Sequence, residues 1–181
     1  MIPATAELIY SRQDIERTLD RLAETLNREF AGQKPIVLVV MIGGMVTAGH
    51  LITRFEFDLE LDYIHATRYR GGTRGQDVQW LAQPRLVLGD RPVLLVDDIL
   101  DEGQTLVAAI RYCREQGARS VTTVVLVEKV HDRRHPDLVV DHVGLQVPDR
   151  YVFGYGMDYR GRLRHLPDIY AIDLEHEDET H

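Results

Sequence analysis

A helix near the start of the chain is predicted by the spacing of its apolar residues. The hydrophobic positions that fall on one helical face are Ile15, Leu19, Leu22, Leu26 and Phe30. Ser11, with Asp14 three positions later, is a variant of the capping box that starts helices. Gly32 lies where such a helix would end. The pattern indicates an amphipathic helix of about four turns.

Three segments predict strands. Residues 36–42 and 91–98 contain continuous apolar runs, as in inner strands of a parallel sheet that are buried on both faces, and residues 120–129 predict a third strand. Residues 43–55 and 103–118, which follow the first two runs, have helical patterns. Strands that alternate with helices build βαβ units. The expected fold is therefore α/β, with a central, mainly parallel, twisted sheet flanked by helices.

The remaining segments have weaker patterns. Residues 57–69 alternate enough to form a strand, and the Gly-containing residues 71–83 suggest a flexible excursion with a weak hairpin. Residues 142–172 are short aromatic and apolar stretches broken by Gly and Pro, so we expect short strands and loops that form a hood. The acidic residues 173–181 are expected to be a solvated tail.

A single domain is expected over residues 1–181, because neither a linker nor an internal repeat interrupts the pattern. Its core would span about residues 8–145. The hood would span about residues 146–172, together with N-terminal residues, and the tail would follow it.

Charge and composition restrict the classes of partner. The 181 residues carry a net charge of −8, whereas a nucleic-acid-binding surface needs a positive field, so we expect no nucleic acid partner. No segment approaches the ~18–20 consecutive apolar residues of a membrane span, and the first residues lack a signal-peptide pattern. The single cysteine, Cys113, lies in a helical pattern, and we expect a buried thiol. These features predict a cytoplasmic protein without a membrane partner.

Residues 93–106, VLLVDDILDEGQTL, place four carboxylates directly after an apolar run. The acids are Asp97, Asp98, Asp101 and Glu102. Ligands of open α/β sheets bind at the carboxyl ends of strands, so these acids are candidate site residues. Neighbouring strand residues point to opposite faces. Asp97 and Asp98 would therefore serve one ligand only if the strand ends near Val96, which we expect.

The turn after these acids can bind an anion. Gly103 would let backbone N–H groups approach closely, and a helix that starts at about Thr105 would add partial positive charge and a hydroxyl. An acidic surface turn with Asp101 as the helix N-cap is the alternative. Four close carboxylates repel one another, since two unit charges at ~4 Å cost about 4 kcal/mol at an effective dielectric near 20. That repulsion favours a hard divalent cation such as Mg²⁺.

The same stretch resembles the phosphoribosyl-diphosphate (PRPP) motif of the type I phosphoribosyltransferases. The motif has four hydrophobic residues, two acids, two apolar residues, Asp, any residue, Gly, any residue and Thr, as in residues 93–105. The family usually has Thr or Ser where this chain has Glu102. The resemblance implies the type I phosphoribosyltransferase fold, PRPP as a substrate, and Mg²⁺ as a cofactor.

Two further segments are similar to the hypoxanthine-guanine phosphoribosyltransferases. Residues 126–134, LVEKVHDRR, resemble the family's strand-end Lys segment. Residues 147–167, VPDRYVFGYGMDYRGRLRHLP, resemble its C-terminal hood. The resemblance covers about residues 7–172, nearly the whole chain.

On the purine side, the resemblance implies that Tyr151 stacks on the base and that the Val152 backbone bonds to the base edge. Lys129 would donate to the exocyclic O6 of the purine. Asp158, next to the purine site, would hold a second Mg²⁺ on the pyrophosphate side, and Arg164 would bind pyrophosphate.

On the PRPP side, the resemblance implies that Asp97 and Asp98 meet the ribose hydroxyls, directly or through Mg²⁺. Asp101 would be the general base that takes the proton from purine N7. The 5′-phosphate would be held by the Thr105 hydroxyl and by backbone amides. Those amides belong to Asp101, Glu102, Gly103, Gln104 and Thr105. We expect the Glu102 side chain to turn away from the phosphate.

Two places depart from the family pattern. Ile42, Gly43 and Gly44 lie where the family has a Leu-Lys-Gly pyrophosphate loop, often with a non-proline cis peptide. Ile42 replaces the lysine, so only backbone amides would contact pyrophosphate there. In the mobile lid loop, Tyr69 is retained but Arg68 replaces the usual serine.

The resemblance implies a Mg²⁺-dependent purine-salvage enzyme that transfers ribose 5-phosphate from PRPP to hypoxanthine or guanine. The family is commonly dimeric or tetrameric, so a homodimer or homotetramer is expected. A PRPP-sensing regulatory protein of the same fold and a xanthine-preferring phosphoribosyltransferase remain the alternatives.

Overall fold

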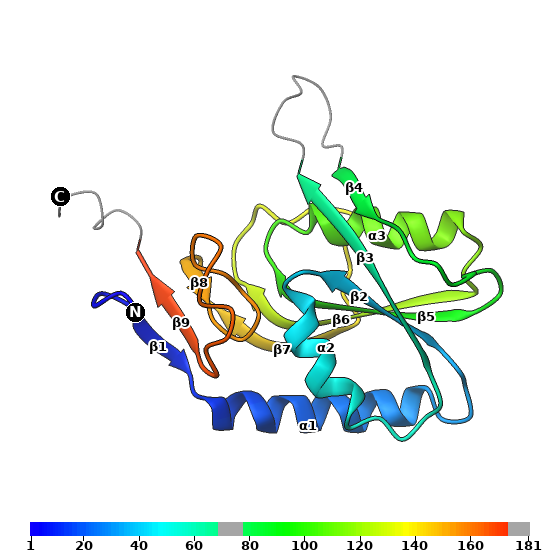
Figure 1. The fold of residues 1–181 in the computed structure, drawn as a ribbon, viewed down its shortest axis with the longest axis horizontal. Coiled ribbons are helices and arrows are strands. Elements are labelled where there is room, and N and C mark those ends of the chain that lie inside the picture. Colours follow the sequence, from blue (N-terminus) through cyan, green and yellow to red (C-terminus); the bar gives the residue numbers. More distant parts are fainter. Residues whose placement is uncertain (69–77, 174–181) are drawn as a thin grey trace.

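A six-stranded sheet forms the centre of the computed structural model, which describes residues 1–68 and 78–173 (Figure 1). Its strand order is β4-β3-β2-β5-β6-β7, and only the edge strand β4 runs antiparallel to its neighbour. The strands are β2 (Ile36–Met41), β3 (Glu60–Arg68), β4 (Val78–Ala82), β5 (Pro92–Leu100), β6 (Ser120–Lys129) and β7 (His142–Val147). The predicted mainly parallel α/β sheet is confirmed.

Helices cover both faces of this sheet (Figure 1). They are α1 (Arg12–Glu29), α2 (Gly44–Ile52) and α3 (Gln104–Glu115). Val37 and Val39 of β2 pack in one cluster with α1 and α2, whereas Ile36 and Leu38 pack in another with α3. Successive strand side chains point to opposite faces, so a strand covered on both sides must be apolar at every position.

The first helix begins as the sequence predicts. Ser11 is the N-cap of α1, and its hydroxyl oxygen accepts from the Asp14 N–H at 3.3 Å. The Asp14 carboxylate accepts in return from the Ser11 N–H at 3.0 Å, which completes the capping box. Among the described residues, no helix is long and apolar enough to span a membrane.

A three-stranded antiparallel sheet, ordered β1-β9-β8, forms the hood beside the main sheet (Figure 1). It consists of β1 (Glu7–Tyr10), β8 (Tyr151–Phe153) and β9 (Ile169–Ile172). An N-terminal strand thus joins C-terminal strands, as predicted. The segment from residue 142 has the pattern expected of the hood, and the boundary was expected at about residue 146, but the whole of β7 pairs with β6 in the main sheet, where its apolar side chains pack against the core.

The expectation that the acidic strand ends near Val96 is wrong, because β5 continues to Leu100. The reason is its pairing. β5 stays in register with β6 through Asp97, Ile99 and Leu100, while its pairing with β2 stops at Val96. The last residues of β5 therefore have a strand neighbour on one side only, and the other side is open to the turn between β2 and α2.

Replacing Ser11 with Ala should lower the free energy of unfolding by about 1 kcal/mol, because the Asp14 N–H loses the hydroxyl oxygen that accepts from it. Urea denaturation would measure the loss. Ser11→Thr keeps the hydroxyl and should stay within a few tenths of a kcal/mol of the parent. Equal losses in the two variants would contradict the capping role.

Candidate active site

A cavity of about 310 Å³ lies at the open side of β5. Its walls come from the ends of β2 and β5, the start of α3, and the hood. The predicted site residues that line it are Gly43, Asp97, Asp98, Asp101, Gly103, Gln104, Thr105, Asp158 and Arg164. Residues far apart in the sequence thus meet at the carboxyl edge of the sheet, as expected for this class of fold.

Asp97 and Asp98 are buried carboxylates on the floor of this cavity, with 9% and 7% exposure. Burial raises the pKa values of both groups, and the negative charge of Asp98 raises the pKa of Asp97 further, well above its usual value. The Asp98 N–H donates to Asp97 Oδ1 at 2.9 Å, and the Ile99 N–H donates to Asp98 Oδ1 at 2.8 Å. Two adjacent buried acids of this kind suit a divalent cation.

A cation here would not be enclosed by protein ligands alone. Among the described residues, no three His, Cys, Asp or Glu side chains converge on a metal position. Mg²⁺ commonly keeps only one or two carboxylates and takes its other ligands from phosphates and water. The residues present therefore fit a Mg²⁺ ion that arrives with an anionic substrate.

The turn between β2 and α2 approaches these acids very closely. A Cβ at Gly43 would collide with the Asp98 carboxylate, and one at Gly44 would lie 2.7 Å from the Val96 carbonyl oxygen. Only glycine fits at these two positions. The Met41–Ile42 peptide bond is cis, which is often the case in the family that this segment resembles. Ile42 is 46% exposed and is not a lining residue, so its side chain takes no part in the cavity wall.

The start of α3 forms a wall of the cavity and has the features that suit an anion. Gly103 is the N-cap, with φ +82°, a left-handed conformation that favours glycine. The first N–H groups of a helix have no intrahelical partner and carry partial positive charge, and Gln104 and Thr105 place them at the cavity. The alternative in which Asp101 caps the helix is wrong, because Gly103 occupies that position.

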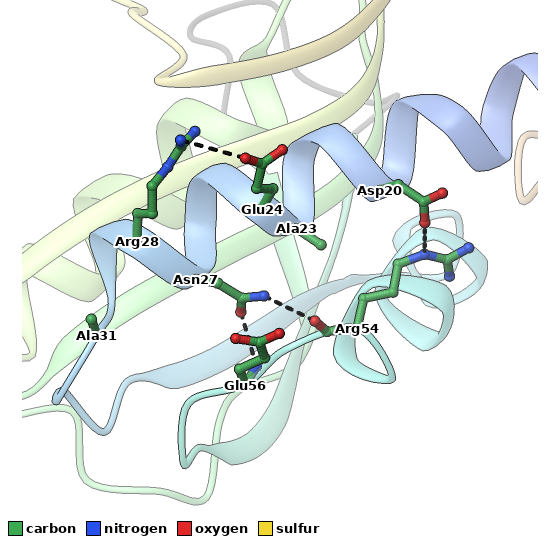
Figure 2. A pocket seen from close by; sticks show the side chains of 8 residues that line it. All are labelled: Asp20, Ala23, Glu24, Asn27, Arg28, Ala31, Arg54 and Glu56. Carbon is green, nitrogen blue, oxygen red and sulfur yellow. Dashed lines mark hydrogen bonds and ion pairs between the residues drawn. The ribbon is translucent and has the colours of Figure 1, made fainter.

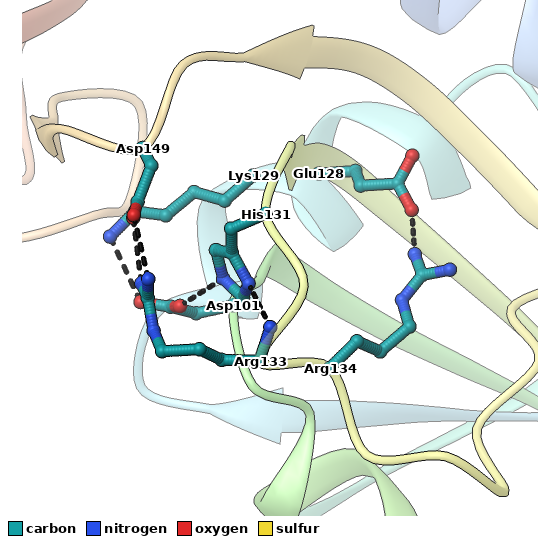
Figure 3. Close-up of polar contacts among 7 residues, drawn as sticks. All are labelled: Asp101, Glu128, Lys129, His131, Arg133, Arg134 and Asp149. Atoms are coloured by element: carbon teal, nitrogen blue, oxygen red, sulfur yellow. Dashed lines mark hydrogen bonds and ion pairs between the residues drawn. The ribbon is translucent and has the colours of Figure 1, made fainter.

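Asp101 lies between two donors at the mouth of this turn (Figure 3). Lys129 Nζ donates to Oδ2 at 2.9 Å, and His131 Nε2 lies 2.7 Å from Oδ1. Burial by itself would raise the pKa of Asp101, but the hydrogen bonds from Lys129 and His131 outweigh it and hold the pKa below its usual value. Asp101 is therefore a paired carboxylate in the free site.

His131 was not among the residues predicted from the sequence. The only available signal was a histidine two positions after the strand-end Lys129. The same loop carries Arg133, whose guanidinium makes two hydrogen bonds to Asp149 at 2.7 and 2.8 Å (Figure 3). Arg134 pairs with Glu128 on the other side of the loop.

The hood contributes Asp158 and Arg164, which bind each other. Arg164 Nη2 donates to Asp158 Oδ1 at 2.8 Å, and Arg164 Nη1 donates to the Gly156 carbonyl oxygen at 2.7 Å. Gly156, at φ +103°, packs directly on the Gly43 carbonyl oxygen. The hood therefore closes on the β2–α2 turn and brings a guanidinium to the cavity.

Besides Ile42 and Gly44, four predicted residues whose side chains the structure describes do not line this cavity: Glu102, Lys129, Tyr151 and Val152. Tyr151 packs edge-on against Tyr159 in the hood, with ring centroids 5.8 Å apart, and Val152 is buried in the main core. Lys129 joins the site only through Asp101. Glu102 is likewise not a lining residue, and the role expected for its N–H stays a prediction.

The predicted lid falls largely outside the described residues. Arg68 is the last residue of β3, and its side chain is not described. Tyr69 lies within residues 69–77, outside the described part of the chain.

A second cavity, of about 560 Å³, lies between α1 and the segment after α2 (Figure 2). Its polar groups bind one another: Asn27 donates to the Arg54 carbonyl oxygen and accepts from the Glu56 N–H, and Arg54 pairs with Asp20. None of the described residues predicted for the site lines this cavity.

Comparisons with known proteins agree with the fold and with the content of the site. A family model described as phosphoribosyl transferase domain matches residues 5–160. A hypoxanthine-guanine phosphoribosyltransferase from Staphylococcus aureus is 32% identical over 171 residues, which cover 93% of this chain and 94% of the relative.

Solved structures share this architecture. The crystal structure of a hypoxanthine phosphoribosyltransferase from Staphylococcus aureus superposes with a TM-score of 0.87 and 29% identity, over 93% of this chain and 92% of that one. A structure named hypoxanthine-guanine-xanthine phosphoribosyltransferase gives a TM-score of 0.84 at 25% identity, over 92% of this chain and 96% of that one. The chain belongs to the phosphoribosyltransferase family, among the hypoxanthine-guanine phosphoribosyltransferases.

Proposed function

We propose that this protein transfers ribose 5-phosphate from PRPP to N9 of hypoxanthine or guanine, giving IMP or GMP and pyrophosphate. One observation carries the proposal: two buried acids, an open helix start and the Asp101–Lys129 pair meet around one cavity. We assign the two buried acids to the ribose, the helix start to the 5′-phosphate, and the Asp101–Lys129 pair to the edge of the purine.

The start of α3 would bind the 5′-phosphate. Backbone amides from Asp101 to Thr105 and the Thr105 hydroxyl would donate to its oxygens, with Gly103 allowing the close approach. The four carboxylates of residues 97–102 need not face the phosphate, because Asp97 and Asp98 lie deeper in the cavity, Asp101 faces Lys129, and Glu102 is not a lining residue.

Asp97 and Asp98 would meet the ribose hydroxyls, directly or through Mg²⁺, because both acids line the one cavity even though β5 continues past them. Loss of pyrophosphate leaves positive charge on the sugar, as in glycoside hydrolysis. Buried carboxylates that are fixed near this charge stabilise it more strongly than water does. Mg²⁺, when bound with PRPP, would neutralise the leaving pyrophosphate.

On the pyrophosphate side, we assign Arg164 and the backbone of the β2–α2 turn. The Arg164 guanidinium donates to Asp158 and to the Gly156 carbonyl oxygen, which hold it at the cavity. Gly156 in turn packs on Gly43, and Ile42, Gly43 and Gly44 would contribute backbone N–H groups only. Asp158 would hold a second Mg²⁺ there.

Binding of the purine would break the Asp101–Lys129 pair that is present in the free site. Lys129 would turn from Asp101 to the exocyclic O6, which favours 6-oxopurines over adenine. Asp101, released from that cation, would then accept the N7 proton as a general base. Tyr151 and the Val152 backbone would have to approach the base as the site closes, together with the lid that contains Arg68 and Tyr69.

We further propose a homodimer or homotetramer in the cytoplasm. Met45, Leu61 and Tyr63 are each about half exposed and line one groove of about 600 Å³ between α2 and β3. Contiguous exposed apolar surface often marks a contact between proteins. Sedimentation equilibrium would measure the mass, and a monomer at micromolar concentration would contradict this assignment.

A steady-state assay with PRPP and hypoxanthine, guanine, xanthine or adenine tests the proposed function. Turnover should occur with hypoxanthine or guanine, should be weak with adenine, and should be lost when EDTA removes Mg²⁺. A xanthine preference would select the alternative of a xanthine-preferring phosphoribosyltransferase, for which the similarity to a hypoxanthine-guanine-xanthine enzyme is a reason. No turnover on any base would leave the PRPP-sensing regulator, which a nucleic-acid-binding assay would then test.

Asp101→Asn should lower kcat by about 10²–10⁴-fold, the usual contribution of a general base, while PRPP binding changes little. Single-turnover kinetics and PRPP titration separate the two quantities. The exposed neighbour Asp132 provides the control, because Asp132→Asn also removes one negative charge from this region. Equal losses of turnover and PRPP binding in Asp101→Asn would contradict the base assignment.

Gly43→Ala should lower kcat/KM by about 100-fold, because its methyl group must displace the Asp98 carboxylate. Gly49→Ala, in the same helix region, meets no atom within 4 Å and should keep near-normal activity. Circular dichroism would confirm that both variants fold. Comparable activity of the two variants would show that the close approach of Gly43 has no catalytic consequence.

A further inference from the structure

The imidazole of His131 is the second partner of the Asp101 carboxylate (Figure 3). It lies 2.7 Å from Oδ1, while Lys129 holds Oδ2 at 2.9 Å, so each donor has one oxygen to itself. The His131 side chain is only 3% exposed, against 14% for Lys129. The contact to Oδ1 is therefore shielded from water more completely than the contact to Oδ2.

The hydrogen on the His131 ring can be assigned from its second contact. The backbone N–H of Arg133 donates to Nδ1 at 3.1 Å, so Nδ1 carries the lone pair. A neutral imidazole has one N–H and one acceptor nitrogen, and Nε2 must therefore carry the hydrogen that faces Asp101. A protonated ring would set a second N–H directly against the N–H of Arg133.

The loop that carries the ring is itself fixed. The Arg133 guanidinium forms a bidentate pair with Asp149, at 2.7 and 2.8 Å, just before β8 begins. Bidentate pairs of this geometry restrict both partners. Arg133 thus holds the imidazole through its N–H, and its side chain ties the same loop to the base of the hood.

We propose that His131 is a positioning residue that keeps Asp101 aimed at purine N7 after Lys129 has moved to the purine. This inference rests on the proposed function and adds a residue to it. The ring retains Oδ1, so that Oδ2, vacated by Lys129, faces the base. An acidic side chain with a single remaining donor keeps its orientation, whereas one with none rotates freely.

The proton balance leaves His131 unchanged. The bond between C1′ and N9 forms as the bond between C1′ and the pyrophosphate oxygen breaks, and that electron pair leaves with pyrophosphate. The N7 proton passes to Asp101 Oδ2. The Nε2–H of His131 stays on the ring throughout and donates to Oδ1.

Removing this donor has a defined effect on the pH profile. A hydrogen bond to the ionised carboxylate lowers its pKa, so removing the donor raises the pKa of Asp101. The base then becomes active only at higher pH, and the acid limb of kcat/KM moves upward. The charged groups that face Asp101 from the neighbouring segments, Lys129, Arg133, Asp149 and the adjacent Glu102, are the same in parent and variant.

Two substitutions of His131 distinguish the effect of its ring volume from the effect of its hydrogen bond. His131→Phe keeps the ring volume without a donor, and should lower kcat by about 10- to 100-fold while the KM for PRPP stays within about threefold. Its acid limb should move to higher pH. His131→Gln places an amide N–H near the position of Nε2, and should restore both kcat and the pH profile.

His142 provides the matched control, because its Nε2 also lies 2.7 Å from a carboxylate oxygen, that of Glu29. His142→Phe removes a comparable contact between β7 and α1, outside the cavity, and should leave kcat and the acid limb unchanged. Nitrogen-15 NMR of the histidine rings in the free protein should show the Nε2–H tautomer for His131.

The outcomes are distinguishable. If the parent turns over a 6-oxopurine and a folded His131→Phe protein has unchanged kcat and an unchanged acid limb, the positioning role is wrong while the proposed function stands. An Nδ1–H tautomer in the NMR spectrum would overturn it as well. If the parent turns over none of the bases, the proposed function fails and the positioning role of His131 fails with it.

Discussion

The site depends on one asymmetry in the hydrogen bonding of β5. This strand remains paired with β6 as far as Leu100, but its pairing with β2 stops at Val96. A strand that lost both neighbours would be a mobile loop, and a strand that kept both would have no room for a ligand. With one neighbour, Asp97 and Asp98 are held in a rigid strand and are still open to a cavity, which is the preorganisation that electrostatic catalysis requires.

The turn between β2 and α2 lies at the open side of β5, where the pairing with β2 has stopped. Gly43 approaches Asp98 so closely that no side chain fits between them, and Gly156 of the hood packs on the carbonyl of Gly43. Three segments that are distant in sequence therefore fix one another by contact. Arg164 belongs to the hood, and the hood is held at the cavity by the contact of Gly156 with Gly43. The position of this positive charge in the site therefore depends on the packing of small residues.

The acids that follow the apolar run of β5 lie in different surroundings. Burial holds Asp97 and Asp98 in a state that favours neutralisation, by a proton or by a cation. Lys129 and His131 hold Asp101 as an ion in the free site. The pKa values of Asp97 and Asp98 are raised and that of Asp101 is lowered, although the three acids lie within five positions of one another. The directions differ because Asp97 contacts a backbone group of its own strand, β5, whereas Asp101 pairs with Lys129 at the end of β6.

Local pattern was sufficient for much of this protein. Helical spacing and the Ser11 capping box located α1, unbroken apolar runs located β2, β5 and β6, and the spacing of acids, Gly103 and Thr105 identified the ligand-binding edge, since these signals depend only on near neighbours. Tertiary contacts decided where β5 ends, that β7 belongs to the main sheet, and that Gly103 rather than Asp101 caps α3. They also decided that His131 shares Asp101 with Lys129, because a pairing across about 30 positions depends on how strands are ordered in the sheet and leaves no periodic trace in the sequence.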